Sequence, residues 1–173
     1  MSRCRTAAPR LSHLDPVSGQ PAMVDVAAKP ISARSATAQA VVRLPPACAA
    51  VLRAGGDTRK GNVLAVARLA GIMAAKRTAE LIPLCHQVPL DGVAVELMVE
   101  ADRCVITASA RCRARTGVEM EALTAAAVAA LTVYDMLKAV SHDLVIERVE
   151  LLRKAGGRRG LIERRPSGPR SQS

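Results

Sequence analysis

The near absence of aromatic side chains is the feature that most constrains what this chain can fold into. Its 173 residues include no Trp, no Phe and a single Tyr, although 50% of the residues are hydrophobic. Because aromatic rings usually supply much of the buried core area, a core here has to be built from Ala, Val, Leu, Ile and Met. Recognition of nucleic acid by base stacking on aromatic side chains is nearly excluded, because a single Tyr is the only ring of this kind in the sequence.

Positive charge is concentrated at the two ends of the chain. The net charge is +10, of which residues 1–22 contribute +2 and residues 153–173 contribute +6. Both ends contain Pro and Gly without a sustained apolar period, which is typical of flexible segments. We therefore expect flexible tails at 1–22 and 158–173, the second of them basic, around a single domain at 23–157. Basic tails give at most non-specific affinity for nucleic acid, so we expect no specific nucleic-acid partner.

The number and spacing of the cysteines indicate the redox state of the compartment in which the protein works. The chain has five cysteines, an odd number, and no Cys-x-x-Cys pair, as is typical of proteins in a reducing compartment. No apolar run reaches the roughly 18 uncharged residues that a bilayer span needs, and no signal-type apolar run follows the first Met. The sequence predicts a cytoplasmic protein without a membrane partner.

The first half of the domain reads as a strand followed by helices. Small and β-branched residues over 31–44 predict a strand, and residues 47–54 predict a short helix before two glycines. Apolar positions at helical spacing then predict one long helix from Asn62 to about Ile82, where Pro83 stops it.

In the second half the apolar residues recur every 2 residues, as in a strand, and no longer every 3.6 residues, as in a helix. Alternation over 93–99 and again over 104–111 predicts a β-hairpin. Thr116 and Glu119 then fit a capping box that opens a long Ala-rich helix running to about Val140.

A closing strand is predicted over 144–152. Without the short helix, the order is strand, helix, strand, strand, helix, strand. This is the βαββαβ order of an α+β, ferredoxin-like fold, with an antiparallel sheet and both long helices on one face. The fold hosts many unrelated activities and indicates no function by itself.

Three polar residues of the Ala-rich helix fall on nearly one face. Asp135 and Lys138 are three residues apart, and Glu121 lies close to four turns earlier. Their spacing fits either a solvated stripe with an ion pair or a catalytic group. Glu119 is explained by the capping box alone.

A loop bounded by prolines brings Leu84, Cys85 and His86 together in apolar surroundings. His86 has the pKa range of a proton-transfer group, whereas Cys85 fits an inert buried thiol. Adjacent Cys and His lack the spacing of a zinc site, so we expect no metal. The sequence also indicates no other cofactor.

Scattered cations could form an anion site if the fold brings them together. They are Arg34, Lys60, Lys76 and Lys154. Lys60 and a glycine precede the predicted helix start, where free backbone amides and the helix dipole favour an anionic ligand. Each cation alone also fits a surface charge.

Several segments resemble the molybdenum cofactor biosynthesis protein C family, the cyclic pyranopterin monophosphate synthases. The resemblance runs in order from about residue 23 to residue 157. The segments that carry it are Met23-Val-Asp-Val, Lys60-Gly, Ala67-Arg-Leu-Ala-Gly-Ile, Ala75-Lys-Arg-Thr, Leu81-Ile-Pro-Leu-Cys-His86, Thr116-Gly-Val-Glu-Met-Glu-Ala-Leu-Thr124, Ala129-Ala-Leu-Thr-Val-Tyr-Asp-Met136 and Lys154-Ala-Gly-Gly.

The resemblance implies an enzyme, a phosphorus-oxygen lyase, whose catalytic domain is residues 23–157. The expected reaction converts a cyclised dihydro-GTP nucleotide to cyclic pyranopterin monophosphate with release of pyrophosphate, early in molybdenum cofactor biosynthesis. The expected assembly is a homohexamer, a trimer of dimers, with sites at subunit interfaces. The alternative is a non-catalytic ferredoxin-like module that binds a small molecule or nucleic acid.

The resemblance also implies roles for individual residues. Asp135, Lys138, Lys60 and His86 are expected to be catalytic, with Asp135 holding Lys138 charged and oriented. The expected substrate-binding residues are Leu84, Cys85, His86, Glu119, Met120, Glu121, Arg34, Lys76 and Lys154.

Two positions depart from the usual family pattern. Gln87 follows His86 where proline is common, and Asn62 stands where the residue after Lys60-Gly is commonly acidic. Gln87 releases His86 from the backbone restriction that a following proline imposes. Asn62 makes the surroundings of Lys60 more positive, which suits phosphate binding.

Overall fold

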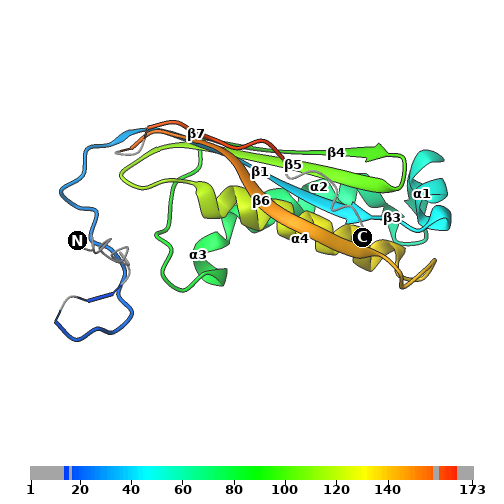
Figure 1. Ribbon diagram of the computed structural model, residues 1–173, viewed down its shortest axis with the longest axis horizontal. Coiled ribbons are helices and arrows are strands. Elements are labelled where there is room, and N and C mark those ends of the chain that lie inside the picture. The colour runs from blue at the N-terminus through cyan, green and yellow to red at the C-terminus, as the bar shows by residue number, and fades with distance from the viewer. Residues whose placement is uncertain (1–13, 16, 158–159, 167–173) are drawn as a thin grey trace, which may run out of the picture.

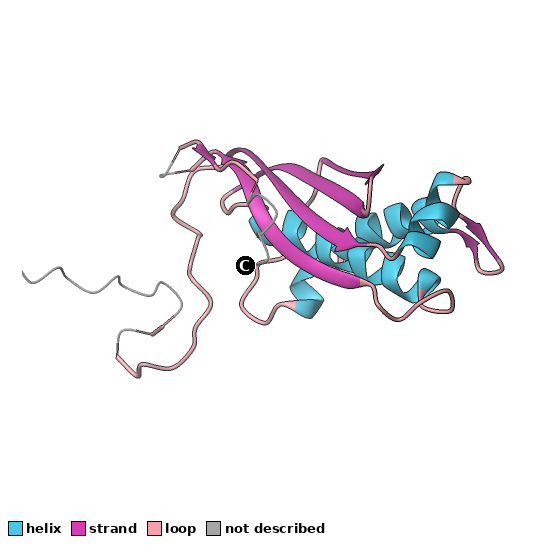
Figure 2. Ribbon diagram, turned by 45° about the vertical axis from the view of Figure 1, so that its right-hand side comes forward, coloured by secondary structure: helices cyan, strands magenta, loops and turns pink. Residues whose placement is uncertain are grey.

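The computed structural model describes residues 14–15, 17–157 and 160–166, and its main body is one antiparallel sheet of five strands with helices on one face (Figures 1 and 2). The strands are β1 (Ser32–Arg43), β2 (Asp57–Thr58), β3 (Gly61–Asn62), β4 (Gly92–Glu100), β5 (Arg103–Ala114), β6 (Val145–Ala155) and β7 (Ile162–Glu163). The helices are α1 (Pro46–Arg53), α2 (Val63–Lys76), α3 (Thr78–Leu81) and α4 (Glu119–Leu137).

The strand order confirms the predicted fold class. The sheet runs β4-β5-β1-β6-β7, and β2 and β3 form a separate small hairpin. Every pairing between neighbouring strands of the sheet is antiparallel. The long helices α2 and α4 lie on the same face (Figure 2), so the main elements follow the ferredoxin-like βαββαβ order.

The core is made of small side chains, as the shortage of aromatic residues predicts. On β1 and β5 the alternate residues that face the helices are buried, and so is the inner face of α4. The buried residues of these elements include Ala36, Ala38, Ala40, Val42, Cys104, Ile106, Ala108, Ala122, Ala125, Ala126, Ala129 and Val133. By length and composition α4 is apolar enough to cross a membrane, but here it is a core helix that packs against both α2 and the sheet.

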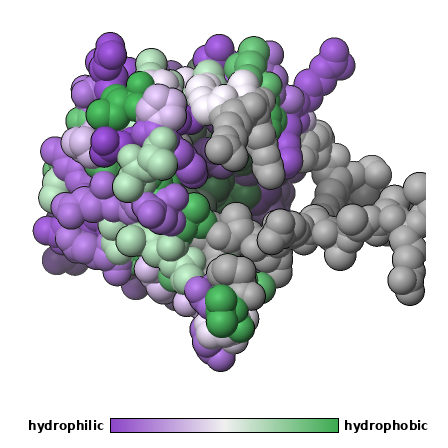
Figure 3. All heavy atoms as spheres, turned by 90° about the vertical axis from the view of Figure 1, so that its left-hand side faces the viewer, coloured by the Kyte–Doolittle hydropathy of each residue, from purple (hydrophilic) through white to green (hydrophobic). Residues whose placement is uncertain are grey.

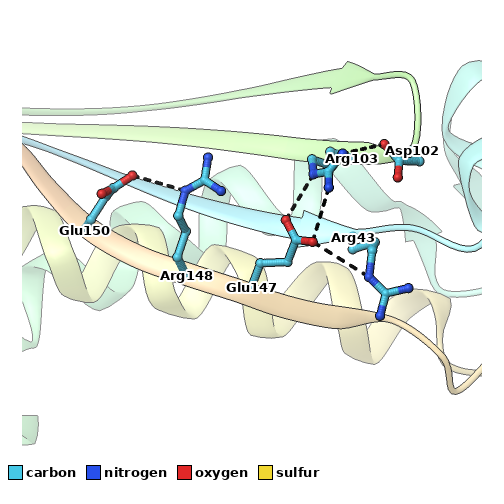
Figure 4. A network of polar contacts seen from close by, with 6 residues as sticks. All are labelled: Arg43, Asp102, Arg103, Glu147, Arg148 and Glu150. Atoms are coloured by element: carbon cyan, nitrogen blue, oxygen red, sulfur yellow. Dashed lines mark hydrogen bonds and ion pairs between the residues drawn. The ribbon is translucent and has the colours of Figure 1, made fainter. Parts of the chain in front are cut away.

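The other face of the sheet carries a charged network (Figure 4). Glu147 is the extra residue of a bulge in β6, between the partners of Val41 and Val42. Its carboxylate accepts a hydrogen bond from Arg103 at 3.0 Å and lies 3.7 Å from Arg43. The bulge therefore directs a carboxylate toward two cations from neighbouring strands.

The predicted single helix over 62–82 is wrong in extent. Helix α2 ends at Lys76, and Arg77 leaves the helical conformation with φ −114° and ψ 15° before the short helix α3. The Thr78 hydroxyl lies 3.3 and 3.0 Å from the carbonyl oxygens of Ala74 and Ala75. A side chain that bonds back to these carbonyls accompanies the break in the helix.

The predicted capping box is also wrong. The residue before α4 is Val118, and no side chain caps the helix. The Glu119 carboxylate instead accepts a hydrogen bond from Lys154 of β6 at 2.6 Å. Helix α4 ends at Leu137, earlier than predicted.

Three short strands have no counterpart in the sequence prediction. Strands β2 and β3 form the hairpin just before α2, and β7 pairs with β6. Strand β7 lies inside the segment that we expected to be a flexible basic tail.

Candidate functional site

An acid lies between two lysines at the carboxyl end of α4. The Asp135 carboxylate pairs with Lys138 at 2.6 Å and with Lys60 at 3.0 Å. Lys60 also donates to the backbone carbonyl of Asp135 at 3.3 Å. The fold thus brings together three of the predicted catalytic residues across 75 positions of sequence.

Local structure explains how each of these residues reaches the cluster. Lys60 lies in the turn between β2 and β3, and Gly61 after it has φ +107°, a conformation that glycine adopts without strain. Asp135 is in the last turn of α4, and Lys138 is the C-cap residue. The three side chains therefore converge at the place where α2 begins and α4 ends.

The hydrogen bonds from Lys138 and then Lys60 lower the pKa of Asp135 below its ordinary value. The hydrogen bond and the charge of Asp135 in turn raise the pKa of Lys138. At neutral pH the cluster is therefore an ionised carboxylate with two cations, and it carries a net positive charge.

A cavity of about 190 Å³ lies at the opposite end of α4. It contains the predicted loop residues together with the first turn of α4. Its lining residues are Leu84, Cys85, His86, Val88, Thr116, Gly117, Glu119, Met120 and Glu121. Six of the predicted substrate-binding residues are thus assembled in one place.

Glu121 is a buried acid in this cavity. It is only 4% exposed, so it does not belong to a solvated stripe with Asp135. Burial raises the pKa of Glu121, and burial followed by the charge of Glu121 raises the pKa of the Cys85 thiol. Cys85 is therefore a weak nucleophile at neutral pH, whereas Glu121 is suited to holding a proton.

His86 is held by the segment that precedes β1. Its Nε2 lies 2.8 Å from the carbonyl oxygen of Val24, inside the Met23-Val-Asp-Val segment. This contact between two distant segments fixes the ring at the edge of the cavity.

A second cavity of about 130 Å³ adjoins the first and contains two of the predicted cations. Arg34 and Lys154 line it, and Gly117 and Glu119 are shared with the first cavity. Gly156 and Gly157 have φ +93° and +81°, and neither has room for a Cβ beside Ala33 and Arg34. The two glycines therefore allow the chain to pass close to the Arg34 guanidinium.

The two clusters lie at opposite ends of α4 and so at opposite ends of the molecule (Figure 1). Glu119 and Asp135 are sixteen residues apart in α4, which corresponds to about 24 Å along a helix. Figure 3 shows the end with the cavities, where hydrophilic and apolar side chains are interspersed. Within one subunit the structure therefore does not bring His86 together with Asp135 and Lys60.

Lys76 belongs to neither cavity. It is exposed in the last turn of α2. Gly71 of α2 approaches Ala125 of α4, and the start of α2 adjoins Asp135, so α2 runs antiparallel to α4. Lys76 therefore lies toward the cavity end of the molecule.

Sequence reasoning missed several residues of the cavities. Val88, Thr116, Gly117 and Ser35 line them, and the carbonyl of Val24 holds His86. The glycines were the available signal, because a glycine just before a helix often marks a close approach of the backbone to a ligand.

Metal-binding potential is limited in the part of the chain that the structure describes. Over residues 14–15, 17–157 and 160–166, no group of three or more His, Cys, Asp or Glu side chains could hold a metal ion. The chemistry that these residues offer is acid–base transfer and binding of anions.

Together, a ferredoxin-like scaffold, a cationic acid–base cluster and a cavity lined by two cations are features suited to the class of protein that binds anions and transfers protons. The sequence matches the model of the MoaC family over residues 23–157, and the chain belongs to that family.

Three curated relatives that the chain resembles carry the name cyclic pyranopterin monophosphate synthase. The protein of Thermomicrobium roseum is 58% identical over 156 residues, which cover 89% of this chain and 93% of the relative. The protein of Herpetosiphon aurantiacus is 55% identical over 87% of this chain and 92% of its own length. That of Xanthomonas campestris pv. campestris is 52% identical, with 91% and 96% covered.

Proposed function

We propose that this chain is a cyclic pyranopterin monophosphate synthase. It converts cyclised dihydro-GTP to cyclic pyranopterin monophosphate and releases pyrophosphate. Its catalytic domain is residues 23–157, the range that matches the family. The observation that carries the proposal is the placement of Asp135 between Lys60 and Lys138, in a member of this family.

The proposed chemistry fits the charges of both clusters. A triphosphate substrate needs cations that neutralise it and stabilise the departing pyrophosphate, and Arg34, Lys154, Lys60 and Lys138 are available. Rearrangement of the purine to a pterin needs several proton transfers, for which Asp135, Lys138, His86 and Glu121 are the candidate groups.

The separation of the two clusters supports a site shared between two subunits. A two-fold axis across α4 would bring the cavity of one subunit next to the Asp135 end of its partner, and the second site would follow by symmetry. Apolar side chains exposed on the outer helix face supply a surface that an assembly can bury. They are Val66, Leu69, Met73 and Leu131.

We further propose a homohexamer, a trimer of such dimers, located in the cytoplasm. The free cysteines Cys48, Cys85, Cys104 and Cys112 fit a reducing compartment. Light scattering at micromolar concentration is expected to give the hexamer mass, and a stable monomer would contradict the shared site.

Turnover of the substrate tests the activity directly. Purified protein is incubated with cyclised dihydro-GTP, and pyrophosphate and pterin are assayed. Wild type is expected to release both, and Asp135→Asn is expected to lower kcat/KM by at least about 100-fold. Absence of pyrophosphate from a correctly folded oligomer would favour the non-catalytic binding module.

Subunit mixing tests the shared site. His86→Ala and Asp135→Asn are each expected to be nearly inactive as homo-oligomers. Co-expressed in equal amounts, they combine an intact cavity from one subunit with an intact Asp135 cluster from another, which restores about one quarter of wild-type activity. Recovery no greater than the sum of the two separate variants would show that each subunit works alone.

A further inference from the structure

The turn that carries Lys60 is closed by the side chain of Asn62. The Asn62 Oδ1 accepts a hydrogen bond from the Ala65 amide at 3.0 Å and caps α2. Its Nδ2 donates to the carbonyl oxygen of Gly55 at 2.7 Å and to the Asp57 carboxylate at 3.0 Å. One side chain thus ties both ends of the turn to the first turn of α2.

Lys60 depends on this turn for its position. Its ion pair with Asp135 joins side chains that are 53% and 52% exposed, and ion pairs between exposed groups are weak because water competes for both partners. The backbone around Lys60 is held by Thr58, whose hydroxyl donates to the Gly61 carbonyl at 2.8 Å and accepts from the Lys60 amide at 3.2 Å. The closed turn fixes the backbone from which the Lys60 side chain reaches Asp135, and the weak ion pair then depends on that backbone position.

The side-chain amide of Asn62 both accepts and donates hydrogen bonds, whereas a carboxylate at this position could only accept them. An Asp at 62 would still cap α2, but it has no proton to donate to Gly55 or Asp57. It would also lie about as close to Asp57 as the present 3.0 Å contact, where like charges repel. Asn62 and Asp57 are therefore a matched donor and acceptor in this chain.

We propose that Asn62, through Asp57 and Gly55, is a positioning residue that holds Lys60 against Asp135. This inference rests on the proposed function for its effect on turnover. Its effect on the Asp135 carboxylate can be measured without any substrate.

The primary measurement is the pKa of Asp135, followed by carbon-13 NMR of protein labelled at the Asp carboxyl carbons and assigned with Asp135→Asn. Lys60 is one of the two groups that lower this pKa, so Lys60→Ala gives the full rise caused by its loss. Asn62→Asp and Asn62→Ser are both expected to raise the pKa of Asp135 toward the Lys60→Ala value. Because Asn62→Ser adds no charge, its rise cannot come from a new carboxylate.

A swapped pair provides the rescue. In Asp57→Asn combined with Asn62→Asp the donor and the acceptor are exchanged and the net charge equals that of wild type, so the pKa of Asp135 is expected to return toward the wild-type value. Turnover should follow, with kcat/KM falling roughly tenfold in Asn62→Asp and recovering to within about threefold in the swapped pair. The melting temperature of Asn62→Asp should fall because two hydrogen bonds are lost and Asp57 repels the new carboxylate. The helix cap is not the cause, since Asp is an equally good N-cap.

Two results would overturn the inference. One is an unchanged pKa of Asp135 in Asn62→Ser while Lys60→Ala raises it. The other is a swapped pair that is no closer to wild type than Asn62→Asp alone. A wild-type protein that does not turn over cyclised dihydro-GTP would remove the proposed function and leave the pKa comparison intact.

Discussion

Replacement of Gly71 by alanine tests how closely α2 and α4 approach. A Cβ at position 71 would lie 2.9 Å from the backbone oxygen of Ala125, 3.2 Å from a methyl group of Val95 and 3.3 Å from the Cβ of Ala129. The first contact is with a helix backbone that cannot move alone. We therefore expect Gly71→Ala to push the two helices apart.

Two opposed effects set how much Gly71→Ala changes the free energy of unfolding. Alanine in a helix interior is favoured over glycine by about 1 kcal/mol, and overpacking of a dense core costs about 1–3 kcal/mol. Because a rigid backbone atom makes the closest contact, the cost falls in the upper part of that range. The expected net result is a loss of about 1–2 kcal/mol in the free energy of unfolding.

Urea unfolding followed by far-ultraviolet circular dichroism measures this loss. Wild type and variant are compared at one protein concentration, since the stability of the proposed oligomer would depend on concentration. Arg68 is exposed on the same helix, so a side chain at this position makes no core contact. The stability difference between Arg68→Gly and Arg68→Ala therefore measures how much alanine is favoured over glycine in this helix when packing is unchanged. If Gly71→Ala were as stable as wild type or more stable, the close approach of the helices would be refuted.

Three further predictions concern the cavity end of the molecule. Glu121→Gln should raise the free energy of unfolding at pH 7, because burial raises the pKa of Glu121 and the charged form costs stability. Urea unfolding at a series of pH values should show this gain shrinking as the pH falls from the raised pKa of folded Glu121 to the ordinary Glu pKa, below which both states are protonated. A gain that persists below the ordinary pKa would contradict the reason given. Cys85 should react with iodoacetamide at pH 7.5 more slowly than glutathione does, since the pKa of its thiol is raised. Glu121→Gln should speed the reaction, because it removes the charge that contributes to this rise. Peptide mass mapping measures both rates, and equal rates in wild type and variant would contradict the charge effect. Lys154→Ala removes the ammonium group that lies 2.6 Å from the Glu119 carboxylate. If Lys154 also contacts the substrate, this change should raise KM for the nucleotide roughly tenfold in steady-state assays. An unchanged KM would show that Lys154 is not part of the substrate site.

The elements that could be predicted from the sequence are those with a long, regular period. Apolar residues alternate over 93–99 in β4 and over 104–111 in β5, and α4 is Ala-rich throughout, so the types of these elements follow from the sequence. The predicted extent of α2 is too long because the break at Arg77, which the Thr78 hydroxyl contacts accompany, leaves no trace in the spacing of apolar residues. The hairpin of β2 and β3 has two residues in each strand, too few for a period to appear.

The site could be predicted only in part, because its contacts join distant segments. Thr116 and Glu119 have the spacing of a capping box, but Lys154, thirty-five residues later, takes the Glu119 carboxylate. Glu121 and Asp135 share a helix face by spacing, yet one is buried and the other exposed, since loop 84–88 covers only the first turn of α4. Lys60 and Asp135 are 75 residues apart in the sequence, so their contact cannot be predicted from the local spacing of residues.

The aromatic-poor composition also gives this protein a built-in optical reporter. Tyr134 is the only tyrosine, and there is no tryptophan to absorb its excitation energy. It immediately precedes Asp135, and its hydroxyl donates to the His142 carbonyl at 3.5 Å. Its ultraviolet emission therefore senses one spot, the end of α4, so ligand arrival or subunit exchange there can be followed in real time without attaching a dye.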